Sequence, residues 1–109
     1  MSDTPTLNRD AEQMRANVGA ASAFLKRMQH PDRLLICCAL MGQELSVRQI
    51  EDMLDLRQPA LSQQLADLRE AGLIASRKEG KQMFYRLIDA RVETFIHGMH
   101  ALFCKADHD

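Results

Sequence analysis

The sequence predicts a mainly α-helical domain that carries one β-hairpin. Apolar residues recur every three or four positions in five separate segments, which is the spacing of an amphipathic helix. Between Leu73 and Leu87 the spacing changes to two, which is the period of a strand. The chain has 109 residues, of which 46% are hydrophobic, as in ordinary globular domains. We therefore expect five helices and one hairpin in a single domain.

The first helix is expected from residue 10 to Met28, because six apolar residues follow one another there at alternating steps of three and four. They are Ala11, Met14, Val18, Ala21, Leu25 and Met28. This seam suits packing against another helix, either in the same subunit or in a second one. Residues 1–9 are expected to be a disordered arm and residues 107–109 a flexible tail, which leaves residues 10–106 as the folded domain.

A second helix is expected to begin at Pro31, since proline fits the first helical turn, and to run to about Met41. Gly42 then stands where a left-handed helix cap is expected. The pattern suggests a buried face made of four residues: Leu34, Leu35, Cys38 and Met41.

The third and fourth helices are predicted from their first residues. Ser46 and Gln49 have the spacing of a capping box, in which each side chain bonds the other residue's backbone N–H. Pro59 marks the first position of the fourth helix, which ends before Gly72. Three leucines form its buried side: Leu61, Leu65 and Leu68.

The hairpin is predicted as two strands that turn at Glu79 and Gly80, after which Asp89 caps a fifth helix. The apolar positions of this last helix again have helical spacing: Val92, Phe95, Ile96, Met99, Leu102 and Phe103.

A short helix, a tight turn, a longer helix and a basic hairpin, in that order, are typical of a winged helix-turn-helix that binds double-stranded DNA. The fourth helix can present small and amide side chains to base edges in the major groove: Gln58, Ala60, Ser62, Gln63 and Gln64. The hairpin, or wing, can contact phosphates or a minor groove through Arg77, Lys78, Lys81 and Gln82.

The charge distribution agrees with a polyanion site of limited area. The net charge is −1, but residues 57–86 carry six basic and three acidic groups, a local excess of +3. No apolar run reaches the roughly 18 residues that span a membrane, so we expect a cytoplasmic protein without a membrane partner. The three cysteines form no C-x-x-C pair, so they are expected to be reduced thiols.

Four segments make the sequence resemble the ArsR/SmtB family of bacterial winged-helix repressors. They are HPDRLLI (30–36), ELSVRQIEDML (44–54), RQPALSQQLADLREAGLI (57–74) and GKQMFYRL (80–87). The resemblance implies a homodimer formed by the first and fifth helices, an inverted-repeat operator, and repression relieved by an inducer. Gln64 departs from the family pattern, because many members have His at this position.

The metal-binding positions of that family are replaced in this chain. Ser46 and Arg48 stand where the arsenic and cadmium sensors of the family have two cysteines. In the fifth helix Asp89 is kept, but Arg91, Leu102 and Lys105 replace the other zinc ligands. We therefore expect no metal and no other cofactor, although His97 and His100, three residues apart, keep a half site for zinc or nickel as an alternative.

The cysteine contexts RLLICCAL and ALFC resemble the persulfide-responsive branch of the family, the SqrR, BigR and HlyU-like repressors. This resemblance implies that Cys38 and Cys104 form a disulfide or polysulfide bridge when persulfides or polysulfides are present, which releases the DNA. It leaves Cys37 as an extra thiol that packs in the core.

Other functions have less support from the residues. A metal-responsive or a general oxidant-responsive repressor is the main alternative, and a protein-interaction module is another. An enzyme is not expected, and no catalytic residue is assigned, because the sequence has no C-x-x-C, no nucleotide-binding loop and no acid/base pair near either cysteine.

Overall fold

The computed structural model describes residues 4–104, with side chains from residue 10 onward, and the chain divides into two compact units between His30 and Pro31. The first unit is helix α1, Thr4–Met28. Its backbone is helical from Thr4, whereas the sequence predicts an arm up to residue 9. Residues 1–3 of that arm and the tail at 107–109 lie outside the described residues.

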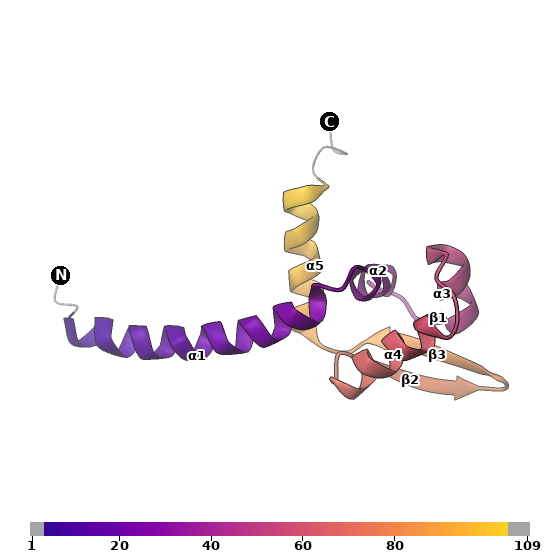
Figure 1. Ribbon diagram of the computed structural model, residues 1–109, viewed down its shortest axis with the longest axis horizontal. Helices are drawn as coiled ribbons and strands as arrows, with labels where there is room; N and C mark the ends of the chain where they lie inside the picture. The colour runs from indigo at the N-terminus through magenta and orange to yellow at the C-terminus, as the bar shows by residue number, and fades with distance from the viewer. Residues whose placement is uncertain (1–3, 105–109) are drawn as a thin grey trace. The chain divides into compact units, whose positions relative to one another are not determined.

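The second unit contains the other four helices and a three-stranded sheet (Figure 1). In chain order its elements are α2 Pro31–Ala39, β1 Leu45–Ser46, α3 Val47–Leu54, α4 Ala60–Glu70, β2 Ile74–Glu79, β3 Gln82–Leu87 and α5 Ala90–Phe103. The sheet is antiparallel with the strand order β1-β3-β2. This arrangement confirms the predicted fold class, a winged helix-turn-helix with five helices.

Local signals in the sequence fix several helix ends as predicted. The Ser46 hydroxyl accepts a hydrogen bond of 3.1 Å from the Gln49 N–H, and the Gln49 side chain accepts one of 2.8 Å from the Ser46 N–H. The Asp89 carboxylate caps α5 by accepting a bond of 2.8 Å from the Arg91 N–H. Gly42 has a φ of 69°, the left-handed conformation expected after α2. Pro59 is the N-cap of α4, whereas the sequence predicts it at the first helical position. The helix therefore begins at Ala60, one residue later than predicted.

The core of the second unit lies where α2 packs against α3, α4 and α5. The α2 residues in this core are Ile36, Cys37 and Ala39, and Leu40, just after the helix, is buried with them, whereas Leu35 is 44% exposed and Cys38 is half-buried. The predicted inner face of this helix is therefore wrong. The helix is apolar on every side from Leu34 to Met41, so the spacing of apolar residues cannot identify the buried face.

The sheet differs from the predicted two-stranded hairpin by one strand. Leu45 and Ser46 pair with Tyr85 and Phe84 of β3, which adds β1 to the sheet. Two residues are too few to show a strand period, which explains why the sequence did not reveal β1. Glu79 pairs with Gln82, so the hairpin turns at Gly80 and Lys81, one residue later than predicted. Within residues 4–104, every helix is too short or too polar to span a bilayer.

Candidate DNA-binding surface and thiol pair

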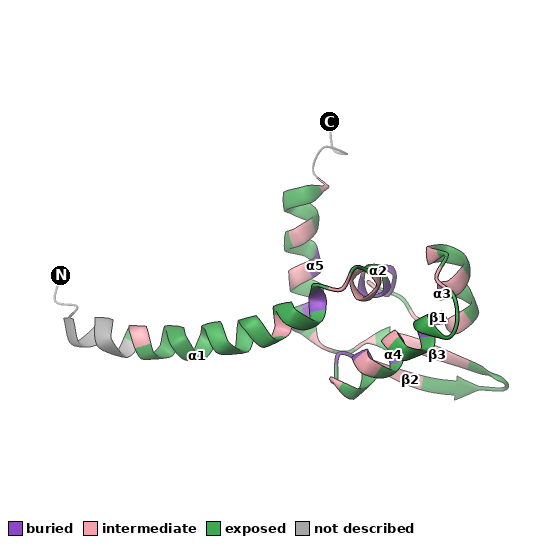
Figure 2. Ribbon diagram, in the orientation of Figure 1, coloured by how far each residue is buried: buried purple, intermediate pink, exposed green. Residues whose placement is uncertain are grey.

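Helix α4 is held by its leucines and exposes its N-terminal end. Leu61, Leu65 and Leu68 are each 1% exposed, as the sequence predicts. The opposite side of the helix and the residue before its cap carry four exposed residues of the predicted DNA-binding set: Gln58, Ala60, Ser62 and Gln63. Figure 2 shows this exposed side of α4. The helix thus has the side chains and the anchoring that major-groove reading requires.

Gln58 has a local role besides any contact with DNA. Pro59 offers no capping side chain, and the Gln58 side-chain carbonyl instead accepts a hydrogen bond of 3.2 Å from the Ser62 N–H and another from the Ser62 hydroxyl. This arrangement satisfies an N–H that the first turn of a helix leaves unpaired. It also turns the Gln58 amide group toward the start of α4.

Two of the predicted reading residues belong to a polar network that reaches α2. Gln63 donates a hydrogen bond of 3.1 Å to Asp67, one turn further along α4. Gln64 is half-buried, and its side-chain oxygen accepts a bond of 2.7 Å from Arg33 Nε of α2. Arg33 Nη2 also forms an ion pair of 2.9 Å with Asp67. No spacing in the sequence predicts the Arg33–Asp67 pair, although Arg33, the one basic residue of α2, is a signal that a partner exists.

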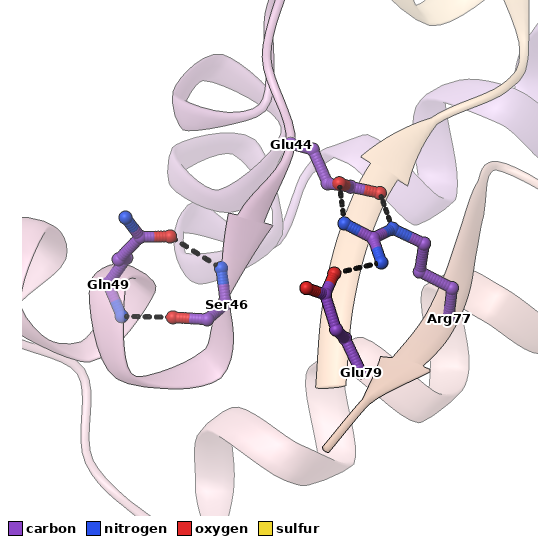
Figure 3. A network of polar contacts seen from close by, with 5 residues as sticks. All are labelled: Glu44, Ser46, Gln49, Arg77 and Glu79. Atoms are coloured by element: carbon purple, nitrogen blue, oxygen red, sulfur yellow. Dashed lines mark hydrogen bonds and ion pairs between the residues drawn. The ribbon is translucent and has the colours of Figure 1, made fainter. Parts of the chain in front are cut away.

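The wing contains one arginine that is held by other side chains. Arg77 donates hydrogen bonds of 2.9 and 2.8 Å to the two carboxylate oxygens of Glu44, and one of 2.5 Å to Glu79 (Figure 3). Its guanidinium carbon also lies 4.8 Å from the centre of the Phe84 ring. The hydrogen bonds from Arg77 hold the pKa of Glu44 below its ordinary value. In this structure Arg77 therefore fixes the wing to the segment before β1.

Two of the three remaining wing residues, Lys81 and Gln82, line a groove between the wing and the helix-turn-helix. Lys78, Lys81 and Gln82 are all exposed. A groove of about 540 Å³ brings Lys81 and Gln82 together with Gln58 and with Arg48, which the sequence analysis had not counted as a DNA contact. Its full lining is Ser46, Val47, Arg48, Glu51, Gln58, Lys81, Gln82 and Met83. Cations and amides from both parts of the motif thus share one concave surface, which suits a nucleic-acid backbone.

The three cysteines are free thiols in different environments. Cys37 has no exposed surface, and burial raises its pKa to about 12. Cys38 and Cys104 are both half-buried. Burial raises the pKa of Cys38, and the charge of Cys104 raises it further. Cys38 lies on α2 and Cys104 is the C-cap residue of α5, and these two helices pack against each other.

The described residues contain no cluster of three or more His, Cys, Asp or Glu side chains that can hold a metal ion. His97 and His100, the alternative half site, are both exposed on α5.

Comparison with known proteins identifies the family. Residues 30–76 match the arsR family of bacterial regulatory proteins. The chain is 45% identical over 86 residues to the biofilm growth-associated repressor of Agrobacterium fabrum, covering 79% of this chain and 74% of that protein. It is 42% identical over 96 residues to the transcriptional activator HlyU of Vibrio cholerae, covering 88% and 89% of the two chains.

Solved structures agree with this result. The transcriptional repressor BigR from Xylella fastidiosa has a TM-score of 0.82 at 37% identity, covering 86% of this chain and 96% of that one. Reduced HlyU from Vibrio cholerae has a TM-score of 0.79 at 42% identity, covering 85% and 98%. These relatives are of the branch that the cysteine contexts resemble. The chain belongs to the ArsR family and is a transcriptional regulator with a DNA-binding winged helix-turn-helix.

Proposed function

We propose that this protein is a homodimeric repressor that binds an inverted-repeat operator and releases it when persulfides or polysulfides bridge Cys38 and Cys104. One observation carries the proposal. Cys38 on α2 and Cys104 at the C-terminal end of α5 belong to two helices that pack against each other, in the unit that also contains α4. A bridge between neighbouring thiols on α2 and α5 changes how these two helices pack, and α2 also packs against α4.

The chemistry is a two-step thiol exchange. The Cys104 thiolate attacks the outer sulfur of a persulfide RSSH, the S–S bond breaks, and the thiol RSH leaves while Cys104 becomes a persulfide. The Cys38 thiolate then attacks the inner sulfur of Cys104, and hydrosulfide leaves as the disulfide forms. The two thiols lose two electrons in total, and the donor's sulfur gains them. A polysulfide donor follows the same course and can leave additional sulfur atoms in the bridge.

The raised pKa of Cys38 supports this order of attack, because fewer Cys38 thiols are ionised at neutral pH than its ordinary pKa allows. Cys37 is excluded from the exchange by its complete burial and its pKa of about 12. This assignment agrees with the sequence, in which the family resemblance selects Cys38 over Cys37.

Exposed apolar residues on α1 and α5 support the homodimer. Met14 and Val18, 60% and 58% exposed, and Leu25, 49% exposed, lie on one side of α1. Near the end of α5, Leu102 and Phe103 are 73% and 77% exposed. Large apolar side chains exposed in such numbers on two helices mark an interaction surface. The family resemblance assigns both helices to the dimer interface, and a second copy of this chain is the partner we propose.

The relatives include both a named repressor and a named activator, so the direction of regulation is part of the proposal. We propose repression, by a protein that acts in the cytoplasm.

The test uses DNA that the reduced protein selects from a random library, with operator affinity measured by fluorescence anisotropy. Sodium tetrasulfide should lower the affinity of the wild type by about 5- to 150-fold, the usual range of allosteric coupling. Cys38→Ser and Cys104→Ser should bind DNA normally and lose this response, while the control Cys37→Ala keeps it. Serine variants that still release DNA would show that the thiol pair is not the sensor.

A parallel arm with hydrogen peroxide separates a persulfide sensor from a general oxidant sensor. We expect tetrasulfide to release DNA at concentrations at which peroxide does not, because the Cys104 thiolate takes a sulfur atom from tetrasulfide in one exchange step, whereas peroxide must first oxidise it to a sulfenic acid. Equal responses to both oxidants would favour the general oxidant sensor.

A further inference from the structure

We infer that Arg33 is the positioning residue that transmits a change in the thiol-bearing helix α2 to the DNA-reading helix α4, an inference that rests on the proposed thiol-controlled release. Arg33 is the third residue of α2, and Cys38 follows five residues later, about 7.5 Å along the helix axis. Both residues therefore move with the same short helix.

The geometry of the Arg33 side chain favours this role. Its guanidinium contacts two successive turns of α4, with Nε bonded to Gln64 at 2.7 Å and Nη2 bonded to Asp67 at 2.9 Å. The Arg33 side chain is only 21% exposed and that of Asp67 is 34% exposed, so solvent screens the pair less than it screens a surface ion pair. The planar guanidinium group makes two bonds in a fixed geometry, so a translation or a rotation of α2 acts on both bonded residues of α4. A single point charge makes no such directional contact.

The network continues from Asp67 to a predicted reading residue. One carboxylate oxygen of Asp67 accepts from Arg33 and the other accepts from the Gln63 side-chain amide at 3.1 Å. Arg33 thus holds the carboxylate that orients Gln63. It also compensates a negative charge on the helix that approaches DNA phosphates. A displacement of α2 that breaks these bonds changes both the orientation of Gln63 and the charge of the reading surface.

Helix α2, which carries Cys38, packs against both of the helices that the inference connects. Helix α2 packs against α5, which leads to Cys104, and against α4, which carries Gln63 and Gln64. The side-chain hydrogen bonds from Arg33 to Gln64 and Asp67 join α2 directly to α4. The apolar contacts of α2 can slide by small amounts, whereas these directional bonds are either made or lost.

The test separates this inference from the choice of inducer by bridging the thiols chemically. Reduced full-length protein is treated with dibromobimane, which alkylates two neighbouring thiols, and intact mass confirms one link per chain. Operator affinity is then compared for linked and unlinked wild type, Arg33→Lys and Asp67→Asn. Arg91→Lys is the control, because Arg91 forms an Arg–Asp pair with Asp89 at 2.7 Å within the start of α5.

We expect the link to lower the affinity of the wild type and of Arg91→Lys by about 5- to 150-fold, and that of Arg33→Lys and Asp67→Asn by less than about threefold. Thermal unfolding distinguishes a role in coupling from a role in stability alone. A residue that only stabilises the fold lowers the melting temperature when it is replaced, but leaves the ratio of operator affinities of unlinked and linked protein unchanged. The charge-exchanged variant Arg33→Asp/Asp67→Arg should recover part of the ratio that Arg33→Asp loses.

Linked Arg33→Lys and Asp67→Asn proteins that keep the wild-type ratio would overturn the role of Arg33 while leaving the proposed sensor intact. If the dibromobimane link weakens DNA binding only in proteins that keep Arg33, but tetrasulfide does not release the wild type from DNA, the role of Arg33 is supported and the proposed inducer is overturned. Failure of the reagent to link the wild type would overturn both, because the thiols would then not be neighbours.

Discussion

Arg77 of β2 and Glu44, the residue before β1, form a two-bond ion pair, with the guanidinium donating at 2.9 and 2.8 Å to both carboxylate oxygens. The pair joins the wing to the segment that leads directly into α3. Because α3 begins the helix-turn-helix, the pair sets the position of the wing relative to the reading motif. We therefore expect Arg77 to contribute to DNA binding through the placement of other groups, among them the exposed Lys78 and Lys81.

Replacement of Arg77 should separate this role from phosphate contact. We expect Arg77→Gln to lower operator affinity without changing its dependence on salt concentration, because the Arg77 donors are already occupied by Glu44 and Glu79. Lys81→Ala is the matched comparison. It should reduce the slope of log affinity against log salt by about 0.9 for one lost phosphate contact. Equal loss of slope in both variants would show that Arg77 contacts phosphate in the complex.

The Glu44–Arg77 pair also predicts a pH dependence of stability. The Arg77 hydrogen bonds lower the pKa of folded Glu44 from its ordinary value of 4.5. A group with a depressed folded pKa stabilises the protein above its unfolded pKa, and this stabilisation is lost as the pH falls through the folded pKa.

Glu44→Gln should therefore be less stable than the wild type at pH 7, and this difference should shrink as the pH falls below 4.5. Urea unfolding at a series of pH values measures the difference, with Glu93→Gln, on the exposed side of α5, as the control for charge. A difference that is the same at neutral and acid pH would assign the stabilisation to packing by the Glu44 side chain.

The environments of the thiols predict their order of alkylation. With a pKa of about 12, only about one Cys37 thiol in 10,000 is ionised at pH 8, and its side chain has no exposed surface. Iodoacetamide should therefore label Cys38 and Cys104 in the native protein and reach Cys37 only in urea. Peptide mass mapping over time measures the three rates. Native labelling of Cys37 as fast as Cys38 would contradict the assigned faces of α2.

The exposed side of α1 predicts how the oligomeric state responds to charge. Val18→Asp places a carboxylate among the exposed apolar residues of this helix and should convert the proposed dimer to a monomer, because burial of an unpaired charge is costly. Ala16→Asp adds the same charge on the opposite side of the helix and should leave the dimer intact. Light scattering coupled to size-exclusion chromatography measures the mass. A dimeric Val18→Asp protein would place the interface elsewhere.

Particular elements show why the sequence predicted some features and not others. The capping box at Ser46 and Gln49 was predictable, because both partners lie within one turn and the residue types fix the bonds. The leucines of α4 were predictable, because that helix has polar residues on its other side. In both cases the information is local.

The features that were missed depend on contacts between distant parts of the chain. Arg33 and Asp67 are 34 residues apart, and no spacing rule pairs them. The strand β1 exists only because β3 lies beside it. The family resemblance selects Cys38 over Cys37, and the structure adds a physical difference, because Cys37 has no exposed surface whereas Cys38 is half-buried.

Mass spectrometry of the reduced wild-type protein after treatment with sodium tetrasulfide tests the central claim most directly. We predict an intact mass lower by two hydrogens, or higher by whole sulfur atoms less two hydrogens, and a proteolytic peptide pair that links Cys38 to Cys104 of the same chain. Separate persulfides on unlinked cysteines, a link through Cys37, or a bond between two subunits would contradict it.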